Sequence, residues 1–215
     1  MIKLYGYWRS TAAYRVRLAL NIKQVAYSQE SVHLVKDGGE QHQPEYQKLN
    51  PQGLVPTIVD DGVVIGQSMA ILEYLEEKYP KRALLPTSFA ERAIARQLCQ
   101  VIASDLHPLN NLRVLQYLSN ELKLDDSEKT KWYHHWLKSG FDSFEQLLQK
   151  NSPNETYCLG GELSMPDVCL IPQIYNAKRF DFSLNNYPLI TKINQNCLKM
   201  TRFQDAIPEN QPDAV

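Results

Sequence analysis

The sequence predicts a small α/β domain followed by an all-helical domain, and three observations support this division. Patterns typical of strands and helices alternate over residues 1–80. A turn-rich stretch over residues 81–88, bounded by Pro80 and containing Pro86, is typical of a linker. Over residues 89–215, apolar residues recur mainly at helical spacing and strand patterns are sparse. A chain of 215 residues is long enough for two such domains.

The first domain is predicted to open with a strand and a helix. Ile2, Leu4 and Tyr5 suit a short strand, and from Thr11 the apolar residues follow periods of three and four, which predicts a helix. Ser10 or Thr11 is a suitable N-cap, because a hydroxyl oxygen can accept a hydrogen bond from a free backbone N–H of the first helical turn.

The middle of this domain is predicted to contain a second strand, a short helix and a hairpin. The strand lies within residues 24–34 and the short helix over residues 44–49. The β-branched runs 57–59 and 63–65 are separated by Asp-Asp-Gly, and glycine accepts the positive φ that a hairpin turn requires. We therefore expect these two runs to form antiparallel neighbouring strands.

A helix over residues 68–79 is predicted to complete the first domain. Ser68 is the expected N-cap, and Ile71, Leu72 and Leu75 share one apolar face. The predicted order of elements is therefore β-α-β-α-β-β-α.

The second domain is predicted to be helical throughout. Helical spacing is clear in four segments, namely residues 91–106, 127–150, 165–180 and 188–200. Ser164 and Asp167 have the spacing of a capping box, which predicts a helix start there. The final residues, PENQPDAV, are expected to be loosely ordered.

Composition and charge exclude several classes of protein. A content of 43% hydrophobic and 22% charged residues with a net charge of −1 is ordinary for a soluble globular protein, and it argues against a nucleic-acid or membrane-surface binder. We find no signal peptide and no membrane span, so the expected location is cytoplasmic. The four cysteines lack metal-ligand spacing, which predicts buried thiols and no bound metal.

The beginning of the chain has the features of a local anion site. Five basic residues precede the first acidic one, Glu30, in the sequence; they are Lys3, Arg9, Arg15, Arg17 and Lys23. A helix that starts near Ser10 would add free amide donors and the positive end of its dipole. The alternative is that Ser10 is only an N-cap and that the arginines are solvated.

Two further segments could contribute to the same site. A second helix start at Gln67 and Ser68 offers amide groups and a hydroxyl. The proline of Val55-Pro56-Thr57 precedes a predicted strand, and a cis bond there would expose backbone that a peptide-like ligand can pair with. Two helix starts could hold both ends of a small, anionic, peptide-like ligand.

Four segments in this order resemble the zeta class of glutathione transferases, and in particular its maleylacetoacetate and maleylpyruvate isomerases. The segments are RSTAAYRVRLAL, NPQGLVPT, GQSMAILEYLEE and NLRVL, and the resemblance covers essentially the whole chain. It implies a thioredoxin-like N-terminal domain, an all-α C-terminal domain, a cis bond before Pro56, glutathione as the cofactor and a homodimer.

The resemblance also implies roles for individual residues. Ser10 stands at the family's catalytic serine, whose hydroxyl donates to the glutathione sulfur, and Thr11 occupies a second serine position. Ala12 stands where several members carry a cysteine, which leaves the serine mechanism intact. The remaining glutathione-binding positions are Gln41 near the glycyl end, Val55 through its backbone, Gln67 and Ser68 at the γ-glutamyl carboxylate, and the closing segment with His107, Asn111, Leu112 and Arg113. His107 could equally be an ordinary capping residue ahead of Pro108.

The implied substrates are small dicarboxylates with a cis double bond conjugated to a carbonyl group. Guanidinium groups bind carboxylates bidentately, so we expect Arg9, Arg113 and Arg179 to hold the substrate. A glutathione thiolate would add to the double bond, allow rotation and leave again, while Arg9 and Arg113 stabilise the enolate. Arg15 and Arg17 lie further along the first helix, and we expect both to be structural.

Two other functions remain open on the sequence. The same thiolate and arginines would also permit a transferase or dehalogenase that acts on small α-halo acids. A non-catalytic glutathione-binding protein of the same fold is the other alternative. A disulfide oxidoreductase is disfavoured, because Ser10 to Ala13 replace its Cys-x-x-Cys. Maleylacetoacetate and maleylpyruvate fit the motifs equally well.

Overall fold

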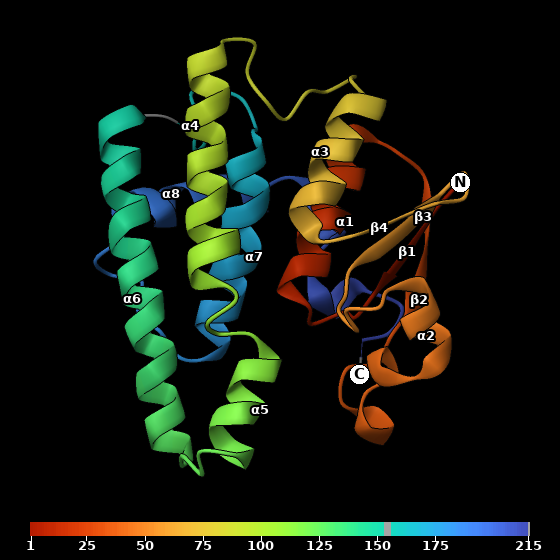
Figure 1. Cartoon of the computed structure of the whole chain (residues 1–215). Coiled ribbons are helices and arrows are strands. Elements are labelled where there is room, and N and C mark those ends of the chain that lie inside the picture. The colour runs from red at the N-terminus through yellow and green to blue at the C-terminus, as the bar shows by residue number, and fades with distance from the viewer. Residues whose placement is uncertain (153–155, 215) are drawn as a thin grey trace. The chain divides into compact units, whose positions relative to one another are not determined.

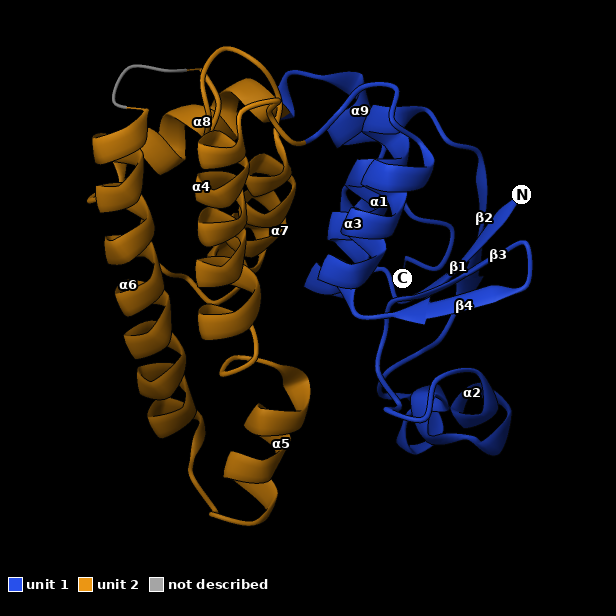
Figure 2. Cartoon of the chain, turned by 45° about the horizontal axis from the view of Figure 1, so that its top comes forward, with its two compact units in different colours: residues 1–84, 198–215 blue, residues 85–197 orange. Residues whose placement is uncertain are grey.

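The computed structural model describes residues 1–152 and 156–214 of the chain. It divides into two compact units, one formed by residues 1–84 with 198–215 and the other by residues 85–197 (Figure 2). The first unit contains the sheet and the second is helical where it is described, so the predicted fold class is confirmed. The C-terminal residues 198–215, however, group with the first unit and not with the helical domain in which the sequence analysis placed them.

The elements of the first unit follow the predicted order β-α-β-α-β-β-α. They are β1 (Ile2–Gly6), α1 (Thr11–Lys23), β2 (Tyr27–Ser31), α2 (Pro44–Leu49), β3 (Thr57–Asp60), β4 (Val63–Gly66) and α3 (Ser68–Lys78), with α9 (Thr201–Gln204) added from the C-terminal residues (Figure 1). The bounds of α2 are those that the sequence predicted.

The four strands form one mixed sheet in the order β2-β1-β3-β4. β1 and β2 are parallel, and α1 is the crossover that parallel neighbours require. β3 and β4 are antiparallel, as predicted, and Asp61 and Gly62 between them have φ values of 49° and 83°. Both values are positive, which is what a two-residue hairpin turn of type I′ needs.

The core of this unit lies between the sheet and the two helices α1 and α3, which pack side by side (Figure 1). Ile71, Leu72 and Leu75 of α3 are buried, which confirms the predicted apolar face. An ion pair of 2.6 Å between Lys23 and Glu76 joins the end of α1 to α3 within this core.

All the regular secondary structure in the described part of the second unit is helical. Its elements are α4 (Phe89–Gln100), a π-helical turn (Val101–Leu106), α5 (Leu112–Asn120), α6 (Asp126–Asn151), α7 (Met165–Arg179) and α8 (Pro188–Leu198). The four segments with helical spacing are thus confirmed, whereas α5 was not predicted. None of the described helices combines the length and the apolar character that a membrane span needs.

A buried capping box starts α7, as its spacing predicted. Asp167 accepts hydrogen bonds from the backbone N–H and the hydroxyl of Ser164, both at 2.8 Å, and from the backbone N–H of Cys158 at 2.9 Å. Burial raises the pKa of Asp167 above its ordinary value. All four cysteines are buried free thiols, as their spacing predicted.

Asp60 at the end of β3 is a buried carboxylate with three donors. Its Oδ2 atom accepts from Lys78 at 2.8 Å, from Tyr79 at 2.9 Å and from Tyr74 at 3.0 Å. Burial alone would raise the pKa of Asp60, but these hydrogen bonds outweigh it and lower the pKa below 3.8. The carboxylate therefore stabilises the fold above the pKa of the unfolded state, and this contribution is lost as the pH falls through the lower pKa of the folded state.

We predict that Asp60→Asn lowers the free energy of unfolding at neutral pH and that its deficit relative to the unsubstituted chain shrinks below about pH 4. Urea unfolding at pH 7 and pH 3 measures this. Asp61→Asn is the matched control, because Asp61 pairs with the same Lys78 but is 74% exposed, and it should change little. A deficit that is equal at both pH values would contradict the account.

Candidate active site

The turn between β1 and α1 presents Ser10. The backbone N–H of Ser10 donates to the carbonyl of Tyr7 at 2.9 Å, which closes the turn. Oγ of Ser10 accepts from the backbone N–H of Ala13 at 3.2 Å, so Ser10, and not the other predicted candidate Thr11, is the N-cap of α1. Because the oxygen acts as the acceptor in this bond, the hydroxyl proton remains available for another acceptor.

Arg9 adds a positive charge to this helix start. Its guanidinium carbon lies 4.1 Å from the ring centroid of Trp8, which is a cation–π distance. Trp8 is buried and Arg9 is exposed, so the indole forms a fixed platform for the guanidinium group. Thr11, the next residue after Ser10, is buried.

Two buried arginines connect α1 to the rest of the candidate site. Arg15 and Arg17 are each 1% exposed. Arg15 donates to the hydroxyl oxygen of Ser68 at 3.2 Å, and Arg17 donates to the carbonyl of Trp8 at 3.0 Å. Both side chains are buried, as a structural role requires. Arg15 contacts the start of α3 and Arg17 contacts the turn before α1, and the sequence analysis assigned both segments to the site.

Ser68 begins α3 but does not cap it, which corrects the predicted N-cap. The capping position belongs to Gln67, whose φ is 64° and whose side chain donates to Gln52 at 2.8 Å and not to the helix. Ser68 is buried, and its oxygen accepts from Arg15, so its hydroxyl proton is free for a different acceptor. The dipole of α3 adds positive potential at the same place.

The loop before β3 holds Val55 in a defined position. Its Val55–Pro56 bond is cis, as the resemblance implied. Tyr46 and Asn50 donate to the carbonyl of Leu54 at 2.6 and 2.8 Å. In the described part of the chain Val55 itself makes no hydrogen bond, so its backbone can pair with a ligand.

Gln41 is buried in the 3-10 helical turn Glu40–His42, which precedes α2. Its amide nitrogen donates to the carbonyl of Leu34 at 3.2 Å. Among the described residues nothing hydrogen-bonds to its Oε1 atom, which is buried. Gln41 therefore offers the second N–H of its amide group and one acceptor oxygen.

In the second unit, the segment from the end of the π-helical turn to the first turn of α5 carries four of the predicted residues. His107 ends the π-helical turn, and Asn111 caps α5 by accepting from the backbone N–H of Arg113 at 3.2 Å. Leu112 is the first residue of α5, and Arg113 is exposed. α6 anchors the segment, because the indole of Trp132 donates to the carbonyl of Leu109 at 2.9 Å.

Arg179, the last residue of α7, is held by a short chain of hydrogen bonds within the same unit. It donates to the side-chain oxygen of Asn176 at 3.2 Å, and Asn176 donates to the hydroxyl of Tyr133 at 2.6 Å. The ring of Tyr133 stacks on Phe180 with centroids 3.8 Å apart. Burial raises the pKa of Tyr133, so its hydroxyl stays neutral.

Sequence reasoning missed the residues that support these positions. Tyr46, Asn50 and Asn176 act through side-chain hydrogen bonds, and no periodicity in the sequence marks them. Asn50 lies within NPQGLVPT, which the resemblance had singled out, so the motif was the only available indication.

Three similarities to known proteins bear on this arrangement. Residues 4–83 match a family model described as glutathione S-transferase, N-terminal domain. A probable maleylacetoacetate isomerase of Vibrio cholerae is 50% identical over 211 residues, which make up 98% of this chain and 97% of that protein.

The third similarity is to solved structures. The holo structure of a maleyl pyruvate isomerase, a bacterial zeta-class glutathione S-transferase, matches with a TM-score of 0.95 and 40% identity over 99% of this chain and 100% of that one. A maleylacetoacetate isomerase from Methylobacterium extorquens AM1, solved with bound malonate and GSH, matches with a TM-score of 0.92 and 37% identity over 99% of both chains.

The hydrogen bonds around Leu54 lead to a prediction that is independent of any ligand. Tyr46 and Asn50 share two partners, because both donate to the carbonyl of Leu54 and both contact the hydroxyl of Thr57, which accepts from Asn50 and donates to Tyr46. Tyr46→Phe should lower the free energy of unfolding by about 1 kcal/mol, the usual net worth of a hydrogen bond. Because both side chains bond to the same two groups, the losses from Tyr46→Phe and Asn50→Ala should not add in the double variant. Denaturant unfolding of the four proteins of the cycle measures this, and strictly additive losses would contradict it.

Proposed function

Because this chain belongs to the glutathione transferase family, and within it to the zeta class, we propose that it is a glutathione-dependent cis-trans isomerase of maleyl keto acids. The observation that carries the proposal is similarity over the full length, at 50% identity over 98% of the chain to a probable maleylacetoacetate isomerase. Glutathione, when bound, supplies a thiolate that adds reversibly to the double bond and so permits its rotation.

The residues present fit glutathione by their chemistry. The hydroxyl of Ser68 has its oxygen occupied by Arg15, so its proton is directed to an acceptor such as the γ-glutamyl carboxylate. The free backbone of Val55 suits the peptide groups of the tripeptide. The buried amide of Gln41 suits the glycyl end. We propose that these residues bind glutathione, together with Gln67, Thr11 and the segment containing His107, Asn111, Leu112 and Arg113.

Ser10 is proposed to donate its hydroxyl proton to the glutathione sulfur. Its position at the amino end of α1 adds the positive end of the helix dipole. A free thiol has a pKa of roughly 8.5, so lowering it by about two units corresponds to about 2.7 kcal/mol in favour of the thiolate. The serine hydroxyl does not need to ionise for this effect.

The arginines are proposed to bind and orient the substrate carboxylates and to stabilise negative charge on its carbonyl oxygen. Arg9 is fixed on the Trp8 ring in the first unit. In the second unit, Arg179 is held by Asn176. Arg113 lies on the first turn of α5. That the Methylobacterium enzyme was solved with malonate, a small dicarboxylate, supports a substrate of this kind.

We also propose a homodimer and a cytoplasmic location. The edge strand β4 exposes Val63 and Val64, and an apolar edge is commonly covered by a partner. The four buried thiols without disulfides suit a reducing compartment.

The proposed activity is tested by following the conversion of maleylacetoacetate and maleylpyruvate with glutathione far below the substrate concentration. We expect many turnovers per glutathione. The keto acid that is converted faster is the preferred substrate. Turnover that stops when glutathione is consumed would instead show a conjugating transferase. Glutathione binding without turnover of either substrate would contradict the proposal and direct attention to α-halo acids or a non-catalytic role.

We predict that Arg9→Met raises KM or lowers kcat for the keto acid by about tenfold, since a hydrogen bond to a charged group is worth about 1.5–3 kcal/mol. The Kd for glutathione should change much less. Arg202→Met, which removes an exposed arginine on α9, is the control and should leave both quantities unchanged. Equal losses in substrate and glutathione binding would remove the role assigned to Arg9.

A further inference from the structure

We propose that Asp213 is a positioning residue for the reaction, and that the C-terminal segment, residues 198–214, clamps the turn that carries Arg9 and Ser10. This inference rests on the proposed function for its catalytic consequence. The clamp itself stands on hydrogen bonds within the first unit, to which the C-terminal segment belongs.

The side chain of Asp213 binds the turn directly. Its Oδ2 atom accepts from the backbone N–H of Trp8 at 3.0 Å and from the hydroxyl of Ser31 at 3.2 Å. Its Oδ1 atom accepts from the side chain of Gln29 at 2.8 Å. One carboxylate therefore joins the turn after β1 to the neighbouring strand β2, and hydrogen bonds to an ionised acceptor are stronger than those between neutral groups.

Arg17 binds the backbone carbonyl of Trp8, the residue whose N–H is bound by Asp213. It donates to the carbonyl of Trp8 at 3.0 Å and to the carbonyl of Ala206, in the C-terminal segment, at 3.2 Å. The N–H and C=O of Trp8 are thus both attached to the C-terminal segment, one directly and one through Arg17. Because Ser10 donates to Tyr7 across the turn, fixing Trp8 also fixes the start of α1.

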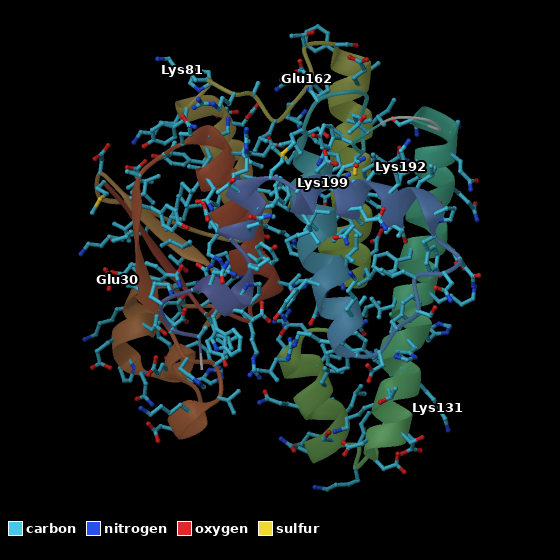
Figure 3. All side chains as sticks on the ribbon, turned by 180° about the vertical axis from the view of Figure 1, so that it is seen from behind. Glu30, Lys81, Lys131, Glu162, Lys192 and Lys199 are labelled. Carbon is cyan, nitrogen blue, oxygen red and sulfur yellow. The ribbon has the colours of Figure 1, made fainter. Side chains whose placement is uncertain are left out.

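The C-terminal segment is itself ordered, which corrects the expectation of a loosely ordered tail for residues 208–214; Val215, the last residue of that expected tail, lies outside the described residues. The buried side chain of Gln211 donates to the carbonyls of Asp205 and Ile207 at 2.9 and 2.8 Å. The segment starts at Leu198, next to the labelled Lys199 (Figure 3), and its short helix α9 packs beside α1. These contacts bring Asp213 to a defined position, so its carboxylate is a fixed anchor for the turn.

The geometry of the turn matters for the proposed chemistry. Arg9 rests on the ring of Trp8, and Ser10 follows two residues after Trp8, so a rotation of the Trp8 peptide would displace both groups. Catalytic groups need placement within about 0.5 Å of the productive geometry. A displacement of about 1 Å can cost up to a hundredfold in rate.

Asp213→Ala tests the clamp. We expect the pKa of the bound glutathione thiol to rise towards its free value and kcat/KM for the keto acid to fall about tenfold. At a pH below both thiol pKa values, the Kd for glutathione should change little, because the contacts proposed at Ser68 and Val55 are untouched. Hydrogen exchange of the Trp8 amide should become faster. The matched control is Asp205→Ala, the same change at an exposed carboxylate of the same segment, which should alter none of these quantities.

The conservative variant Asp213→Asn keeps one acceptor oxygen and should recover part of the loss. An Asp213→Ala protein with unchanged thiol pKa and unchanged Trp8 exchange would overturn the inference. Failure of the proposed function is distinguishable from this result, because it shows as absent turnover in the unsubstituted chain. The thiol pKa and the Trp8 exchange would then still decide whether the clamp exists.

Discussion

The buried guanidinium groups of Arg15 and Arg17, two residues of α1, hold the candidate site of the first unit together. Arg15 occupies the oxygen of Ser68 at the start of α3, and Arg17 holds the carbonyl of Trp8 in the turn before Ser10. The starts of α1 and α3, the two places suited to an anion, are therefore both hydrogen-bonded to arginines of α1. A buried charge is costly unless it is hydrogen-bonded, so these bonds are strongly favoured once the core around α1 has formed.

The hydrogen-bond directions explain how the site can favour an anion. Ser10 and Ser68 both use their oxygen atoms as acceptors within the protein, from Ala13 and from Arg15. Each hydroxyl proton therefore remains available for a further acceptor, at the positive end of a helix dipole. Glutathione presents two negative groups that match such donors, namely its γ-glutamyl carboxylate and its thiolate. Two of the arginines proposed to bind the substrate are each held by a neighbouring residue. Arg9 lies on the ring of Trp8, and Arg179 donates to Asn176.

Much of the first unit follows from local sequence patterns. The hairpin at Asp61-Gly62, the helix over residues 44–49 and the N-cap at Ser10 all depend on neighbouring residues, and each was predicted. The hydrogen bond from Trp8 to Asp213 joins residues 205 positions apart, which no local pattern can indicate. The contacts of the buried Arg15 and Arg17 could not be predicted either. Arginine is usually exposed, and its position in a helical repeat does not show what its guanidinium group contacts. The motif resemblance named the site residues but not the groups that hold them.

The central claim is that the amino end of α1, with Ser10, stabilises the glutathione thiolate. The most direct measurement is the ultraviolet absorbance of the thiolate as a function of pH, at a protein concentration that binds all the glutathione. The account predicts an apparent pKa about two units below the value of roughly 8.5 for a free thiol. Bound glutathione that titrates at its free value would contradict the account.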